Sequence, residues 1–131
     1  MLDPGRACMV AGDPNACGDV ATIEAAGGTF EVVYAAAHCH APSCLSMEWW
    51  DTDTNELLCR NAPTFGNGTA AVHDEKGFVV GIPPCLWGSE AEGLRAPLRI
   101  HLASNFSSIK RVNSTWGHWG VMALWQMRGS Y

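Results

Sequence analysis

The chain has 131 residues and a formal net charge of −5, from eight Lys and Arg against thirteen Asp and Glu. A chain of this length suits one domain, residues 1–131, built around a single core. Its acidic balance gives no electrostatic footprint for nucleic acid or anionic membranes, and no apolar run approaches the roughly 20 residues of a membrane span.

Six cysteines and three Asn-x-Ser/Thr sequons indicate an oxidising, secretory environment. The sequons, which predict surface glycosylation, begin at Asn67, Asn105 and Asn113. We therefore expect a secreted protein that is extracellular or lies at the cell surface. The first residues lack the charged and apolar regions of a signal peptide, so either a leader has been removed or this is a piece of a longer chain.

The even cysteine count predicts three disulfides and no free thiol. Sequence does not choose among the many formal pairings, but short loops favour three of them. These are Cys8 with Cys17, Cys39 with Cys44, and Cys59 with Cys85. Zinc ligation is the competing interpretation, but the chain has no Cys-x-x-Cys pair to support it.

Short runs of strand-forming residues, separated by turn residues, follow one another along most of the chain. Residues 1–19 predict a loop pinned by Cys8 and Cys17. The strands expected after it are residues 20–25, 29–40, 44–51, 56–61, 70–73, 78–82, 98–104, 109–113 and 121–128, with 98–104 and 109–113 forming a hairpin around Asn105. Without an amphipathic helix, this pattern predicts an all-β fold: an antiparallel β-sandwich, jelly-roll-like and stapled by disulfides.

The strand 29–40 ends in His38-Cys39-His40. Strand residues two apart point to the same face, roughly 6.5 Å apart along the chain, so both imidazoles can reach one ion while Cys39 faces the other way. The simpler interpretation is that the two histidines merely lie side by side, because the motif is common.

The end of the chain offers a further metal-ligating side chain. Met122 opens the last predicted strand, and His118 lies in the Gly- and Trp-rich loop before it. Residues 121, 123, 125 and 127 form the more apolar face and are expected to face the core, which leaves Met122 on the other side. Met122 then either packs under a loop or is covered by a ligand or partner.

A strand ending in His-x-His, several short strands with cysteines, and a methionine opening the final aromatic strand resemble the C-terminal copper domain of the type II, ascorbate-dependent copper monooxygenases, the family of peptidylglycine α-hydroxylating monooxygenase and dopamine β-hydroxylase. The resemblance runs loosely from Phe30 to Met127. It implies a jelly-roll domain in which His38, His40 and Met122 bind the copper that activates oxygen. Val121 stands where that family usually has an acidic residue.

The chemistry of the three side chains agrees with copper. Two imidazoles and a soft thioether suit an ion that cycles between Cu(I) and Cu(II). Zinc is the second choice, because it would prefer a third histidine or a carboxylate to a thioether. His118 would then serve as that third ligand. His118 is otherwise a neighbour of the site or unrelated to it, and His73 and His101 are interpreted as ordinary surface or core residues.

The resemblance stops short of a complete enzyme. Members of that family carry a second, N-terminal copper domain that supplies an electron, whereas only 37 residues precede His38 here. Whether the chain is an enzyme therefore stays open, with a copper-dependent monooxygenase as the class if it is one. The expected function is a secreted copper-binding module, either a fragment of an oxidase or a stand-alone relative.

The alternative function is a non-catalytic extracellular glycoprotein sandwich. Six tryptophans are an unusual number, and Trp116 and Trp119 flank His118 in a loop. Exposed tryptophans stack on sugars or bury protein interfaces, and edge strands permit self-assembly. Carbohydrate, a second copy of the chain or another extracellular domain are thus the expected partners. Core positions are expected for Trp87, Trp125 and one of Trp49 and Trp50.

No catalytic residues are assigned. Asp51 and Asp53 resemble a carboxylate pair, but such residues beside a turn are usually turn formers. Cys39 and Cys44 lie close to the histidines, but an oxidising environment favours a disulfide over a nucleophile.

Overall fold

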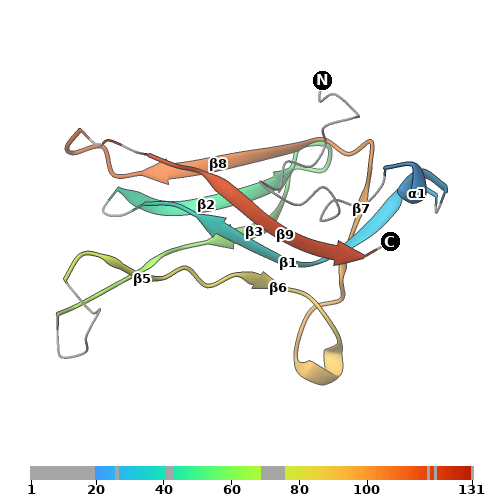
Figure 1. The fold of residues 1–131 in the computed structure, drawn as a ribbon, viewed down its shortest axis with the longest axis horizontal. Helices are drawn as coiled ribbons and strands as arrows, with labels where there is room; N and C mark the ends of the chain where they lie inside the picture. The colour runs from blue at the N-terminus through green and yellow to red at the C-terminus, as the bar shows by residue number, and fades with distance from the viewer. Residues whose placement is uncertain are drawn as a thin grey trace.

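The computed structural model describes residues 20–25, 27–40, 43–68, 76–117, 119 and 121–130. Two antiparallel sheets enclose a common core and form the predicted β-sandwich (Figure 1). The elements are α1 (Val20–Ala25), β1 (Thr29–His38), β2 (Cys44–Asp51), β3 (Glu56–Asn61), β4 (Thr64–Phe65), β5 (Val79–Gly81), β6 (Cys85–Leu86), the 3-10 helix η1 (Glu90–Glu92), β7 (Leu98–His101), β8 (Phe106–Val112) and β9 (Leu124–Ser130). The predicted loop 1–19, with Cys8 and Cys17, and the predicted strand 70–73 lie outside the described residues.

The first sheet is built around β1, which pairs with three other strands. β9 pairs with β1 over residues 31–38, so it occupies one whole edge. β7 and β6 therefore share the other edge, at residues 29–32 and 34–35. Every one of these pairings is antiparallel.

The second sheet has the order β3-β2-β8. The predicted strands 44–51 and 56–61 are present as β2 and β3 and form a hairpin, with its turn at residues 52–55. Asp51 acts as a turn former, because its Oδ1 accepts hydrogen bonds from the backbone nitrogens of Asp53 at 2.8 Å and Thr54 at 3.0 Å. Two short strands, β4 and β5, form a separate pair.

The side-chain alternation of β1 changes phase at a bulge. The register with β9 shifts between Val32 and Tyr34, so Val32 and Ala35 are both buried while Val33 is 36% exposed. A single alternation through the whole strand was therefore a wrong prediction. From Ala35 onward the alternation is regular, and it brings Ala37 and Cys39 into the core.

Residues 20–25 form a helix, and their prediction as a strand was wrong. The segment VATIEA contains good helix formers, and the backbone nitrogens of Gly27 and Gly28 bond to the carbonyls of Glu24 and Ile23 at 3.0 and 2.8 Å. Both glycines have positive φ, +92° and +72°, which is how a helix C-terminus closes. The Gly-Gly pair thus ends a helix rather than turning a hairpin.

The predicted hairpin around Asn105 is also wrong. β7 pairs with β1 in the first sheet and β8 pairs with β2 in the second, so the connection crosses the sandwich. Such a crossing needs long-range pairing that a local pattern does not reveal.

The last strand begins at Leu124, so Met122 precedes it rather than lying inside it. Its predicted core face holds only in part. Trp125 packs against the core, whereas Val121 and Met127 are 51% and 40% exposed. Among the described strands, β9 pairs only with β1. Few neighbouring residues therefore cover the side chains of β9.

Two disulfides tie the sheets together. Cys39–Cys44 links the end of β1 to the start of β2, and Cys59–Cys85 links β3 to β6. Both pairings were predicted, and none of the described cysteines is free. Between the sheets, Trp49, Trp87 and Leu58 are buried in the main core cluster.

Asn61 is a third tie between the sheets. Its side chain is fully buried on β3, and its Oδ1 accepts the backbone N–H of Ala37 on β1 at 2.6 Å. Its Nδ2 donates to the sulfurs of Cys59 at 3.3 Å and Cys85 at 3.5 Å. The ladder between β1 and β6 ends at the pair Ala35–Cys85, because Pro84 precedes β6, and it does not reach Ala37. The side-chain oxygen of Asn61 supplies the acceptor there instead.

Glu48 holds the outer side of the second sheet. Its side chain, 6% exposed, accepts hydrogen bonds from Arg111 at Nε (2.8 Å) and Nη2 (3.1 Å) and from Trp50 Nε1 (3.2 Å). Arg60 Nε lies 3.5 Å away. The hydrogen bond from Arg111 lowers the pKa of Glu48, against desolvation, which raises it. The charged carboxylate therefore joins all three strands of this sheet.

Replacing Asn61 by Leu should lower the free energy of unfolding by about 1–3 kcal/mol, because it leaves the buried Ala37 N–H without an acceptor at similar side-chain volume. Urea unfolding followed by tryptophan fluorescence measures the change. Glu56→Gln, at the exposed start of the same strand, is the control and should change little. An Asn61→Leu variant as stable as the wild type would contradict the assignment.

Glu48→Gln should lower the free energy of unfolding by about 1–3 kcal/mol near pH 7, because the hydrogen bonds from the charged Arg111 are weakened. Since the folded-state pKa of Glu48 is lowered, its contribution is complete above its ordinary pKa of about 4.3 and is lost as the pH falls below that value. When unfolding is measured at several pH values, the gap in free energy of unfolding between wild type and variant should therefore close at low pH. A gap that stays constant down to about pH 2 would exclude ionisation of Glu48 as its cause.

Candidate metal centre

His38 and His40 lie side by side on the exposed face at the end of β1. The regular alternation after the bulge buries Cys39 between them and leaves both imidazoles exposed. Their Nε2 atoms are 2.9 Å apart, so one ring donates a hydrogen bond to the other. The rings meet edge to face, with centroids 4.9 Å apart. The predicted convergence of the two imidazoles is thus present in the fold.

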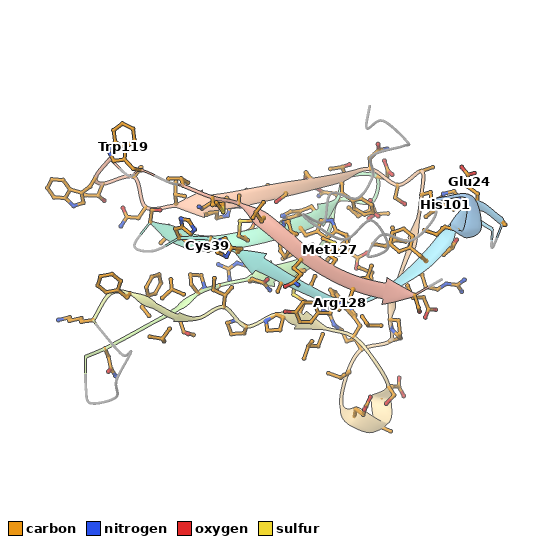
Figure 2. The ribbon with its side chains drawn as sticks, viewed as in Figure 1. Glu24, Cys39, His101, Trp119, Met127 and Arg128 are labelled. Carbon is orange, nitrogen blue, oxygen red and sulfur yellow. A yellow bond between two sulfur atoms is a disulfide. The ribbon has the colours of Figure 1, made fainter. Side chains whose placement is uncertain are left out.

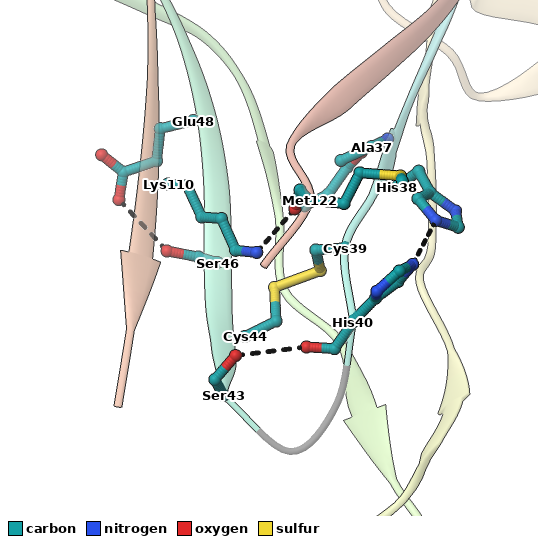
Figure 3. The surroundings of a disulfide bond; sticks show 11 residues. Ala37, His38, Cys39, His40, Ser43, Cys44, Ser46, Glu48, Lys110 and Met122 are labelled. Carbon is teal, nitrogen blue, oxygen red and sulfur yellow. Dashed lines mark hydrogen bonds between the residues drawn. A yellow bond between two sulfur atoms is a disulfide. The ribbon is translucent and has the colours of Figure 1, made fainter. Parts of the chain in front are cut away.

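Met122 is brought to the same place by the register between β1 and β9. Ala35 lies opposite Met127 and His38 lies opposite Leu124. The pairing ends there, so Met122 lies two residues before the first paired residue of β9, at the same end of β1 as His38 and His40. Figure 3 shows the Met122 side chain extending toward the pair of imidazoles.

Lys110, on β8 of the second sheet, holds the backbone at Met122. Its Nζ donates to the Met122 carbonyl oxygen at 2.6 Å (Figure 3). Burial lowers the pKa of Lys110. Sequence reasoning missed this residue, because its partner lies in another sheet and no local motif marks the contact.

The two nitrogens are 2.9 Å apart because one ring hydrogen-bonds to the other, so an ion that bound both would take the place of the shared proton. The thioether adds a soft ligand of the kind that selects Cu(I).

The other histidines do not extend the pair within the described residues. His101 is exposed at the end of β7, where its Nδ1 accepts a hydrogen bond from the backbone of Ala103 at 3.1 Å. His73 and His118 lie outside the described residues. In the described part of the chain, no group of three His, Cys, Asp or Glu could hold a metal ion. A third protein ligand from those residues would therefore be the sulfur of Met122.

Disulfide Cys39–Cys44 supports the histidine pair from behind. Cys39 lies between the two histidines in sequence and is buried with Cys44 and Met47. Because the bond fixes the end of β1 to the start of β2, it limits the movement of the backbone that carries both imidazoles.

Comparison with known proteins identifies the family. A family model described as SURNod19, Stress up-regulated Nod 19, matches residues 8–128. The chain belongs to the SURNod19 family. No curated protein and no solved structure gives a significant match.

Membership of the SURNod19 family overturns the resemblance to the copper monooxygenases. That resemblance rested on three ligand positions and a strand order. A His-x-His pair at a strand end, with a methionine near another strand, is too short and common a pattern to identify a family.

All three sequons of this SURNod19 domain are accessible, as predicted. Asn67, Asn105 and Asn113 are exposed. The Oδ1 of Asn113 accepts hydrogen bonds from Thr115, at 3.0 Å from its nitrogen and 2.6 Å from its Oγ1. Glycosylation at the three positions stays a prediction.

Asn105 also has a structural contact. Its backbone N and Nδ2 donate to the two carboxylate oxygens of Asp53, both at 3.0 Å, and its carbonyl accepts the backbone N–H of Thr52 at 2.9 Å. These hydrogen bonds lower the pKa of Asp53, the side-chain bond most. Asn105 thus ties the β7–β8 connection to the β2–β3 turn.

The tryptophans divide into buried and exposed sets. Trp49 and Trp87 are each 5% exposed and Trp125 packs on the core, as predicted. Trp116 and Trp119 are 77% and 100% exposed, and Figure 2 shows Trp119 at the far end of the loop between β8 and β9.

No helix in the described part of the chain is long and apolar enough to cross a membrane.

Asn105→Ala should lower the free energy of unfolding by roughly 1 kcal/mol or less, because it removes the side-chain hydrogen bond to Asp53. Ser107→Ala destroys the same sequon but keeps the asparagine, so it should leave the stability nearly unchanged. Thermal unfolding of the secreted protein, before and after enzymatic deglycosylation, separates the two effects. Equal destabilisation by both variants would indicate that a glycan, and not the Asp53 contact, stabilises this corner.

Proposed function

We propose that this SURNod19 domain is a secreted module that binds one copper ion through His38, His40 and Met122. The observation that carries the proposal is the Nε2–Nε2 separation of 2.9 Å between two exposed imidazoles. The course of the Met122 side chain toward the two imidazoles supports the thioether as third ligand (Figure 3).

Copper is favoured over zinc by the chemistry of the ligands. The two imidazoles suit Cu(II), and the thioether suits Cu(I). With both oxidation states accommodated, the site can hold copper through a change of charge. Zinc, the second choice, gains little from a thioether and would need another ligand.

Secretion is supported by the disulfides and the sequons. Cys39–Cys44 and Cys59–Cys85 suit an oxidising compartment, and three exposed asparagines offer glycosylation sites. Such a compartment also gives the thioether a role, since Cu(I) there must be held against oxidation by soft ligands.

Carbohydrate binding or assembly with another protein is a second candidate function. It is supported by the exposure of Trp116 and Trp119, whose rings can stack on a sugar or enter an interface. This surface lies in the loop that leads to Met122, so both functions can belong to one end of the domain.

Copper binding is tested with the purified secreted domain by competition against chromophoric chelators of known Cu(I) and Cu(II) affinity. Met122→Ala should weaken the affinity for Cu(I) at least about tenfold and the affinity for Cu(II) less than about threefold, because only the soft ligand is lost. His38→Ala should weaken both oxidation states. Binding should also weaken toward acidic pH, because protons compete for the imidazoles.

The chain offers matched controls for both variants. Met127→Ala removes a methionine of nearly equal exposure, 40% against 41% for Met122, from the same end of the chain. His101→Ala removes an exposed histidine from β7. Neither should change the affinity for copper. A wild-type domain that takes up neither Cu(I) nor Cu(II) stoichiometrically would rule out the copper site.

A further inference from the structure

The segment before β9 carries a proposed ligand but has little packing of its own. The ladder between β1 and β9 begins at the pair His38–Leu124, so Met122 lies two residues beyond it. Val121, Met122 and Leu124 are 51%, 41% and 54% exposed. A thioether on such a segment would occupy many positions unless another contact fixed the backbone.

Two side chains of β8 reach across the sandwich to this end of the chain. Lys110 Nζ donates to the Met122 carbonyl at 2.6 Å, and Ser108 Oγ accepts the indole N–H of Trp125 at 2.8 Å. Ser108 and Lys110 are two residues apart on one strand, so they share a face. The second sheet thus holds Met122 and Trp125 at neighbouring points on the first.

Lys110 can take this role because β8 is itself well fixed. β8 pairs with β2 along its whole length, and Arg111, the next residue, is held by Glu48. Together these contacts connect the backbone at Met122 to the rigid part of the second sheet. The histidines, by contrast, are fixed by β1 and the Cys39–Cys44 disulfide.

We propose that Lys110 is a positioning residue of the copper site: by holding the Met122 carbonyl it keeps the thioether beside the imidazoles and so sets the preference of the site for Cu(I). The inference rests on the proposed function. Its physical basis is pre-organisation, since a ligand that is already ordered loses less conformational entropy when the ion binds. The imidazoles need no such help, so the affinity for Cu(II) should be nearly independent of Lys110.

The test compares Lys110→Met with Lys110→Arg, which keeps a charged donor, and with Lys76→Met, which removes the other lysine of the chain. Affinities for Cu(I) and Cu(II) are measured by chelator competition. Lys110→Met should weaken Cu(I) roughly tenfold and leave Cu(II) within about threefold. Lys110→Arg should retain most of the Cu(I) affinity, and Lys76→Met all of it.

A double-mutant cycle shows whether Lys110 acts through Met122. In a Met122→Ala background the sulfur is already absent, so adding Lys110→Met should cause no further loss of Cu(I) affinity. X-ray absorption of the Cu(I)-loaded domain gives a second readout. The sulfur neighbour of copper should be seen in the wild type and in Lys110→Arg, and should be lost or weakened in Lys110→Met although Met122 is present.

The outcomes separate this inference from the proposed function. If the wild type binds copper and depends on Met122, but Lys110→Met keeps both its Cu(I) affinity and its sulfur neighbour, only the positioning role is wrong. Equal weakening of both oxidation states, or additive losses in the cycle, would mean that Lys110 acts through the fold or its charge, and this also overturns the inference. A wild type that binds no copper, or binds it independently of Met122, overturns both.

Discussion

The register between β1 and β9 is the constraint on which the rest of the candidate site depends. It joins the beginning of the sandwich to its end, and by pairing His38 with Leu124 it brings Met122, two residues before Leu124, close to histidines more than 80 positions earlier in the sequence. A shift by one residue would turn every side chain of β9 to the opposite face. Gly129 helps to fix this register, because a Cβ there would overlap the backbone of Glu31. The ladder therefore brings the segment of Met122 to the histidine end of β1, and the contact from Lys110 holds the backbone there.

The two sheets are held together mainly near their edges. Asn61 and the disulfide Cys59–Cys85 close one side, where Pro83 and Pro84 interrupt pairing with β1. Cys39–Cys44 closes the end at the histidines, and Lys110 and Ser108 close the side of β8 and β9. Buried tryptophans fill the space between. Each tie crosses from one sheet to the other, so the sandwich resists sliding at the end where the site lies.

Local sequence patterns predicted what depends on neighbours in the chain. The shared face of His38 and His40, the short loop of Cys39–Cys44 and the turn after Asp51 all follow from spacings of a few residues, and the structure contains each of them. The predictions that failed concern features that depend on residues distant in sequence. The bulge at Val33 is a property of pairing with β9, and the passage from β7 to β8 is decided by which sheet each strand joins. Lys110 was missed for the same reason. The helix at residues 20–25 is different: its propensity was visible in the local sequence, but the segment was predicted as a strand.

Rigid and adjustable parts of the candidate site come from different kinds of structure. The histidines lie at the end of a paired strand whose next residue, Cys39, is buried and tied to β2 by a disulfide, so the backbone that carries them is held by the fold. The thioether belongs to an exposed segment before the ladder begins. If the domain binds copper as proposed, the histidines on the better-held backbone would decide whether the ion is held at all. The methionine would then alter which oxidation state is preferred without altering the fold, since the residues that stabilise the sandwich do not depend on where its sulfur lies.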